Sequence, residues 1–186
     1  MKSRKPKEKQ HSGGFSVIEM LVVVGIIGIL SGTLLGFNRS SEKTIALATE
    51  QQRVMSILAR ARSLAVQRYT GGSEVYTCGI LVNLSGGSIS TLAVTRAKSE
   101  KITTCPSNAV GATAVLTNQT IESRLLEKGV TIKSGPSFIY FSSPFLETTF
   151  SPDTGASGII TLQVAGVPNE PQIEVTAGGS IMQKVN

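Results

Sequence analysis

The sequence predicts an α+β fold in which a long N-terminal helix packs on a C-terminal antiparallel β-sheet body. Apolar residues in 15–70 have the spacing of helices, whereas later ones form short runs between turn residues. Aromatic residues make up 5% of the chain, tryptophan is absent and glycine occurs 19 times, a composition that favours strands and turns over a helical bundle. The length of 186 residues suits one globular domain with an extension.

Residues 1–14 (MKSRKPKEKQHSGG) form a polar, basic leader that ends in a Gly-Gly pair. Its five lysines and arginines and one glutamate give +4, which leaves +2 of the formal +6 for residues 15–186. The pI of about 9.6 is therefore weak evidence for nucleic-acid binding. Basic residues beside an apolar span hold that end of the chain in the cytoplasm, so the rest is expected to lie outside it.

Residues 15–37 are expected to form a transmembrane helix. This segment contains 23 residues and one formal charge, Glu19. As a helix it would measure about 34 Å, enough to cross a hydrocarbon core of roughly 30 Å. In a secretory signal peptide a small-residue cleavage motif follows the apolar run. Here the Gly-Gly pair precedes it.

Residues 38–70 continue as an amphipathic helix that enters the globular body. Gly71-Gly72 predicts that this helix ends near Tyr69. Its apolar residues recur at helical spacing and form one stripe that needs a partner. They are Val54, Ile57, Leu58, Ala61, Leu64 and Ala65.

Residues 71–186 are expected to form a β-rich globular domain with one sheet face against this stripe. Pairs such as Gly86-Gly87 and Gly178-Gly179 separate its apolar runs. The predicted strands are Val75–Val82, Ile89–Val94, Ala112–Leu116, Val130–Ile132, Phe138–Phe141, Ile159–Val164, Ile173–Thr176 and a closing Ser180–Lys184.

Cys78 and Cys105 are the two cysteines of the chain. An even number in a membrane-targeted chain permits a disulfide in an oxidising compartment, and two separate buried thiols are the alternative. Two cysteines without neighbouring histidines supply too few ligands for a tetrahedral metal site, so no metal is expected.

Glu19 is costly for a simple membrane anchor. A carboxylate at the centre of a membrane costs on the order of 2.5 to 3.5 kcal/mol, less near an edge, so by default it has a function and a partner. Cleavage after Gly14 would create an amine at Phe15 and make Glu19 the fifth residue of the mature chain. A neighbouring subunit's amine could then pair with Glu19. Alternatively, Glu19 simply lies at the membrane interface of a passive anchor.

The string SGGFSVIEML at residues 12–21 resembles the type IV pilin and type II secretion pseudopilin family. The resemblance implies that a prepilin peptidase cleaves after Gly14, that Phe15 is N-methylated and that Glu19 assists subunit docking. It further implies a subunit held in the lipid bilayer of the inner membrane, with its body in the periplasm. Other pilins or pseudopilins would receive it into a filament at an inner-membrane assembly platform with its ATPase.

Four glycines, Gly25, Gly28, Gly32 and Gly36, interrupt the apolar helix. Small residues at a spacing of four allow close helix approach, which suits packing between neighbouring subunits. Each also lowers helix stability by about 1 kcal/mol relative to alanine, so the segment could equally stretch or melt during assembly. Many family members have proline at the position of Gly36, and its absence here argues against a proline kink.

A second resemblance covers the body. Val54–Arg68, the strand with Cys78, Leu125–Ile132 and Phe150–Leu162 look like the pseudopilin H and FimT-like minor pilin group, some of whose members bind DNA. Candidate DNA contacts are Arg53, Arg60 and Arg62. The chain lacks the Arg-rich C-terminal stretch of the DNA-binding members, so arginines that are solvated or contact other subunits are the favoured interpretation.

The residue inventory argues against an enzyme. His11, the one histidine, lies in the leader, and Asp153 is the one aspartate of the chain. No Ser-His-Asp or Cys-His arrangement can be built in the mature protein, and no cofactor is expected. The prediction is a minor pilin or pseudopilin of a type IV pilus (fimbrium) or a type II secretion pseudopilus. The alternatives are a DNA-uptake pilin and a membrane-anchored extracytoplasmic domain without a filament role.

Overall fold

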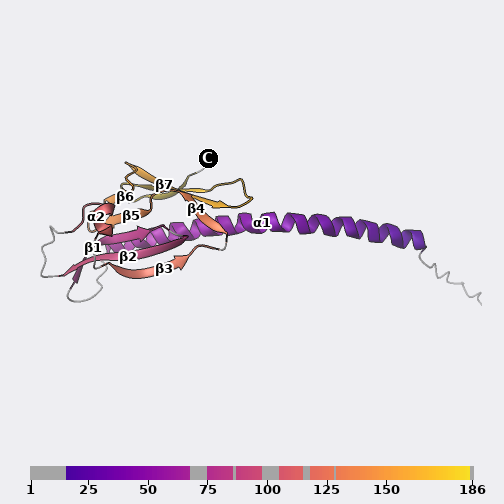
Figure 1. The fold of residues 1–186 in the computed structure, drawn as a ribbon, viewed down its shortest axis with the longest axis horizontal. Helices are drawn as coiled ribbons and strands as arrows, with labels where there is room; N and C mark the ends of the chain where they lie inside the picture. The colour runs from indigo at the N-terminus through magenta and orange to yellow at the C-terminus, as the bar shows by residue number, and fades with distance from the viewer. Residues whose placement is uncertain are drawn as a thin grey trace, which may run out of the picture. The chain divides into compact units, whose positions relative to one another are not determined.

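The computed structural model describes residues 16–67, 75–85, 87–97, 105–114, 118–127 and 129–184, with the backbone alone for residues 34–40. This part of the chain holds two helices and nine strands (Figure 1). The helices are α1 (Val17–Val66) and α2 (Ala109–Thr113). The strands are β1 (Val75–Asn83), β2 (Ser88–Ala97), β3 (Gln119–Leu125), β4 (Val130–Ser134), β5 (Phe138–Ser142), β6 (Thr148–Ser151), β7 (Ser157–Val164), β8 (Gln172–Thr176) and β9 (Ile181–Lys184).

The chain divides into two compact units, Met1–Arg39 and Ser40–Asn186. In the first unit, the described residues are those of the N-terminal part of α1, and every described side chain from Val17 to Thr33 is exposed. Among the residues that the structure describes, no helix combines the length and apolarity needed to cross a membrane. Phe15 and the side chains of residues 34–37, which belong to the predicted span, lie outside the described part.

The second unit contains two antiparallel sheets. Sheet A has five strands in the order β3-β2-β1-β5-β6, and sheet B has four in the order β4-β7-β8-β9. The hairpin of β1 and β2 pairs Val75 with Ala97 and Asn83 with Ser90, with a register shift between Thr77 and Gly79. A backbone hydrogen bond links the two sheets: the Thr148 amide at the start of β6 donates to the carbonyl of Ala177, directly after β8, at 2.9 Å.

The apolar stripe of α1 supplies the centre of the main core. Val54, Leu58, Ala61 and Ala65 are completely buried. They belong to one cluster with residues of both sheets, among them Ile80, Ile139 and Phe141 of sheet A and Ile160, Leu162 and Ile173 of sheet B. Since these four lie three or four residues apart, they share one face of the helix, as the spacing predicts. The predicted α+β class is confirmed, with the helix covered by two sheets instead of one.

The prediction of a strand at Ala112–Leu116 is wrong for residues 112–114, the part of it that the structure describes. Ala109–Thr113 is a short helix, because Asn108 caps it: the Gly111 amide donates to Asn108 Oδ1 at 2.7 Å. Sequence reasoning also missed β3 and β6. Most side chains of β3 are exposed, so it lacks the apolar alternation that identifies a strand. The strand β3 is formed instead through its antiparallel pairing with β2.

Candidate functional site

Ser16 fixes the start of α1. The Glu19 amide donates to Ser16 Oγ at 3.3 Å and to the Ser16 carbonyl at 3.1 Å, and the Met20 amide donates to that carbonyl at 3.2 Å. Ser16-Val17-Ile18-Glu19 has the spacing of a capping box, with the capping serine three residues before a glutamate. The sequence interpretation did not use this signal. The cap places Glu19 in the first helical turn.

The position of Glu19 in the first turn of α1 stabilises the negative charge of its carboxylate. Unpaired amides at a helix N-terminus carry partial positive charge, which favours an acidic side chain by about 0.3 to 1 kcal/mol. This is smaller than the cost of a carboxylate deep in a membrane, so the cap alone does not account for Glu19 there. No ion pair of Glu19 is formed among the described residues. Gly14 and Phe15 lie outside those residues, so their cleavage and methylation stay predictions.

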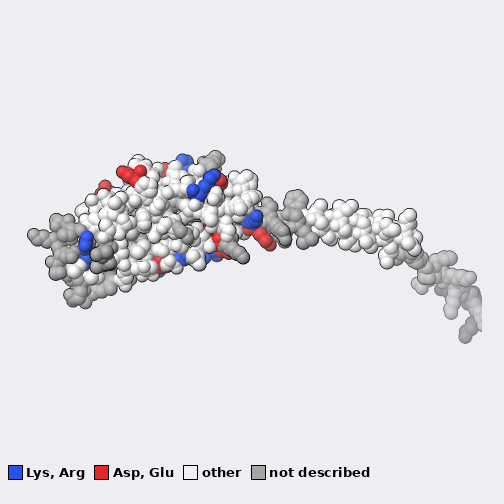
Figure 2. Space-filling view, in the orientation of Figure 1, with Lys and Arg blue, Asp and Glu red and all other residues white. Residues whose placement is uncertain are grey.

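The helix surface that follows Glu19 is apolar and open. Exposed fractions of its large apolar side chains run from 46% for Val23 to 71% for Ile29. Figure 2 shows neither sign of charge on the visible face of the described part of the first unit, whereas both signs mix over the second unit. A continuous apolar surface of this kind marks a contact with lipid or protein.

The glycines of this surface leave room for a close neighbour. A Cβ atom added at Gly25, Gly28 or Gly32 would meet no atom within 4 Å. Gly36 lies among the residues whose side-chain surroundings are not described. The helix surface at Gly25, Gly28 and Gly32 is therefore open, and its packing against another subunit stays a prediction.

The candidate DNA contacts Arg53 and Arg60 are held by glutamates. Arg53 Nη1 donates to Glu127 Oε2 at 2.8 Å and to Glu50 Oε2 at 3.4 Å, and Arg60 Nη1 donates to Glu122 Oε2 at 2.9 Å. The hydrogen bond to Glu127 is the main reason that the pKa of Arg53 is raised, followed by the bond to Glu50. These pairs connect α1 to β3 and the residues after it, which gives the two arginines a structural role.

Arg62 differs from the other two. Its side chain lies beside Gly179, where an added Cβ atom would be 3.1 Å from Arg62 Nε. Arg62 is partly buried, and its Nε has no hydrogen-bond partner in the described structure. The structure therefore does not bring Arg53, Arg60 and Arg62 together as one exposed basic surface, which favours the interpretation without DNA.

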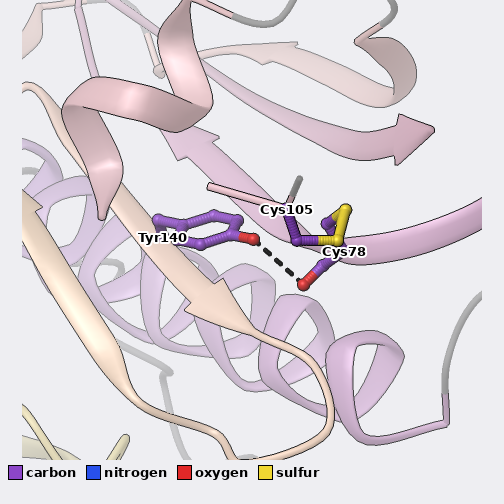
Figure 3. The surroundings of a disulfide bond; sticks show 3 residues. All are labelled: Cys78, Cys105 and Tyr140. Atoms are coloured by element: carbon purple, nitrogen blue, oxygen red, sulfur yellow. Dashed lines mark hydrogen bonds between the residues drawn. A yellow bond between two sulfur atoms is a disulfide. The ribbon is translucent and has the colours of Figure 1, made fainter. Parts of the chain in front are cut away.

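Cys78 and Cys105 form a disulfide, so the predicted bond is confirmed and the alternative of two separate thiols is wrong. Their Cα atoms are 5.4 Å apart across a sequence separation of 27. Figure 3 shows Tyr140 beside this bond, with its hydroxyl donating to the Cys78 carbonyl at 2.9 Å. Ser143 also donates its amide to that carbonyl, at 2.8 Å. The disulfide thus belongs to a buried polar network on sheet A.

Burial raises the pKa of Tyr140 from 10.0 to about 12. An unfolded chain can ionise this phenol at a lower pH than the folded protein, so folding stability is lost as pH rises from 10 towards 12. The loss should reach about 2 kcal/mol.

Replacing Tyr140 with phenylalanine should remove this dependence, at a cost of about 1 kcal/mol near neutral pH for the lost hydrogen bond. Urea unfolding of both proteins in steps from neutral pH to pH 12 measures the difference. The natural protein should have the higher free energy of unfolding near neutral pH, and Tyr140→Phe should have the higher one as the pH approaches 12. A constant difference between the two proteins across this range would contradict the expectation.

Residues 9–35 match the family model of the prokaryotic N-terminal methylation motif. The matched range includes Gly14, Phe15 and Glu19. No curated protein and no solved structure matches the chain. The motif supports a type IV pilin-like or pseudopilin-type protein, with leader cleavage, methylation and assembly with other pilins in a filament. Among the described residues, no group of three or more His, Cys, Asp or Glu could hold a metal.

Proposed function

We propose that the chain is a minor pilin or pseudopilin, a structural subunit that a prepilin peptidase processes after Gly14 and that assembles through its N-terminal helix. The observation that carries this proposal is the arrangement at the start of α1. A capped first turn holds Glu19, and the open, mostly apolar helix surface of residues 20–33 follows it directly. The methylation motif over residues 9–35 lends independent support.

The arrangement can serve two successive stages. Before assembly, lipid can cover the apolar surface while the leader holds its charge of +4 in the cytoplasm. After cleavage, neighbouring helices can cover the same surface, and Glu19 can pair with a neighbour's Phe15 amine. An unpaired charge in an apolar filament core would cost several kcal/mol, so this pair would also fix the axial register of neighbouring subunits.

The function does not call for catalysis by the chain itself, and we propose a structural role without enzymatic activity. A DNA-uptake role has less support, because Arg53 and Arg60 are paired with glutamates. Salt-dependent DNA binding by a fragment beginning at Ser40, lost on replacing Arg53, Arg60 and Arg62, would favour that role instead.

Mass spectrometry of the native protein tests the proposal. The mature chain is expected to begin at Phe15, to lack residues 1–14 and to carry a methyl group on its new amine. The same protein expressed without a prepilin peptidase should retain all 14 leader residues. A native protein with an intact leader would contradict the filament role and favour a passive membrane anchor.

A further inference from the structure

Sheet A has apolar residues on both of its faces. Ile80 and Val82 of β1 point into the main core with α1, and Leu81 between them points to the opposite face, as alternation along a strand requires. On that opposite face a second, separate cluster forms. We name it the outer cluster, and its buried members are Cys78, Leu81, Val94, Ala109, Ala112 and Tyr140.

Residues 105–114, which include α2, cover this face; Figure 3 shows a short helix above Tyr140. The helix has five residues, and its cap is local, from the Gly111 amide to Asn108 Oδ1 at 2.7 Å. So short a helix is unstable by itself in water. Its fully buried side chains are the small Ala109 and Ala112, while Val110 is 61% exposed.

The disulfide is the covalent attachment of the cover to sheet A, beside the burial of its two alanines and a hydrogen bond from Asn118 Nδ2 to the Ala112 carbonyl at 3.0 Å. Two alanines bury little apolar area, and hydrophobic stabilisation is roughly proportional to that area. The disulfide joins Cys105, at the start of the cover, to Cys78 in the middle of β1. Closing a loop of 27 residues in this way strongly limits how far the cover can move when its packing is lost.

We infer that residues 105–114 form a redox-sensitive cover, closed over the outer face of sheet A while Cys78 and Cys105 are bonded and open once they are reduced. A dithiol reductant would supply two electrons and two protons, leave both cysteines as thiols and itself become a cyclic disulfide. Opening would expose Leu81, Val94 and Tyr140. The main core shares no residue with the outer cluster, so α1 and both sheets stay folded.

The cover therefore gives the body two surfaces that depend on the redox compartment. In an oxidising environment the outer face is closed and its apolar side chains are buried. In a reducing one, the same folded body presents an apolar face. This property does not depend on filament assembly, and its test is independent of the one for leader cleavage.

Hydrogen exchange of the full chain in detergent, followed by mass spectrometry with and without dithiothreitol, tests the inference. Reduction is expected to speed amide exchange in residues 108–114 by on the order of a hundredfold. Exchange in Val54–Ala65 and in β7 should stay the same. Unchanged exchange in the cover would mean that packing alone holds it, and faster exchange everywhere would mean that the bond holds the whole body. Either result overturns the inference.

A double variant, Cys78→Ser with Cys105→Ser, provides the matched control. It should show the fast exchange of the reduced protein, with no further response to dithiothreitol. Reduction of already folded natural protein gives the same information if the variant does not fold. Tyr140 supplies a second measurement, because the ultraviolet titration of its phenol should move from about 12 towards 10.0 once the cover opens. A titration that stays in place after reduction would contradict opening.

Discussion

Replacing Glu19 with glutamine is expected to reduce incorporation into filaments at least a hundredfold. In the proposed assembly, the carboxylate pairs with the Phe15 amine of a neighbour inside an apolar core. Glutamine keeps the size of the side chain but leaves that amine without an opposite charge, and breaking one partner of a buried pair costs roughly 3 to 5 kcal/mol. Shearing of cells, followed by quantification of the chain in filament and membrane fractions, measures the effect.

The helix cap at Ser16 provides a matched control for this experiment. Ser16 bonds the backbone amide of Glu19, so Glu19→Gln leaves the cap in place. Ser16→Ala is the matched variant: it removes the cap at a cost of about 1 kcal/mol and keeps the carboxylate. We expect Ser16→Ala to assemble far better than Glu19→Gln. Equal assembly of Glu19→Gln and the natural protein would show that the carboxylate serves only the helix N-terminus, and the pairing with Phe15 would have to be abandoned.

Replacing Leu58 with alanine is expected to destabilise the body by about 3 kcal/mol. Leu58 is completely buried on α1 and belongs to the cluster that joins α1 to both sheets. Truncation removes apolar contacts and leaves a cavity that the residues on the two sheets cannot easily fill. Urea unfolding of the chain measures the change in the free energy of unfolding.

Leu125 provides the matched control for Leu58. It is 77% exposed at the end of β3, so the same substitution to alanine removes little buried surface. Its effect should stay within about 0.5 kcal/mol. Similar losses for Leu58→Ala and Leu125→Ala would mean that α1 does not form the centre of the core, contrary to the described packing.

Local patterns predicted the first part of the chain well. The stripe on α1 could be found because residues three and four apart on a helix always share a face, whatever they pack against. The start of the helix was also available from the sequence, as a serine followed three residues later by a glutamate, although only the structure drew attention to it. The described helix ends at Val66, close to the position that Gly71-Gly72 predicts.

The β-rich part was predicted less accurately because its pairings are not local. The run at Ala112–Leu116 is apolar enough for a strand, yet a polar residue before it, Asn108, caps a helix there. In β3, exposed polar residues are held by pairing with β2 across the sheet, for example where Ser90 Oγ and Ser123 Oγ lie 3.0 Å apart. A residue pattern along one strand does not reveal such a partner.

The class of the fold, the helical stripe and the motif with Gly14, Phe15 and Glu19 can be predicted from the sequence, because each depends on neighbours along the chain. The division into two sheets, the bonding of Cys78 to Cys105 and the pairing of Arg53 with Glu127, 74 residues apart, become visible only in the folded body. The physical reason is that these contacts depend on which strands lie side by side. That order follows from the packing of the whole body around α1.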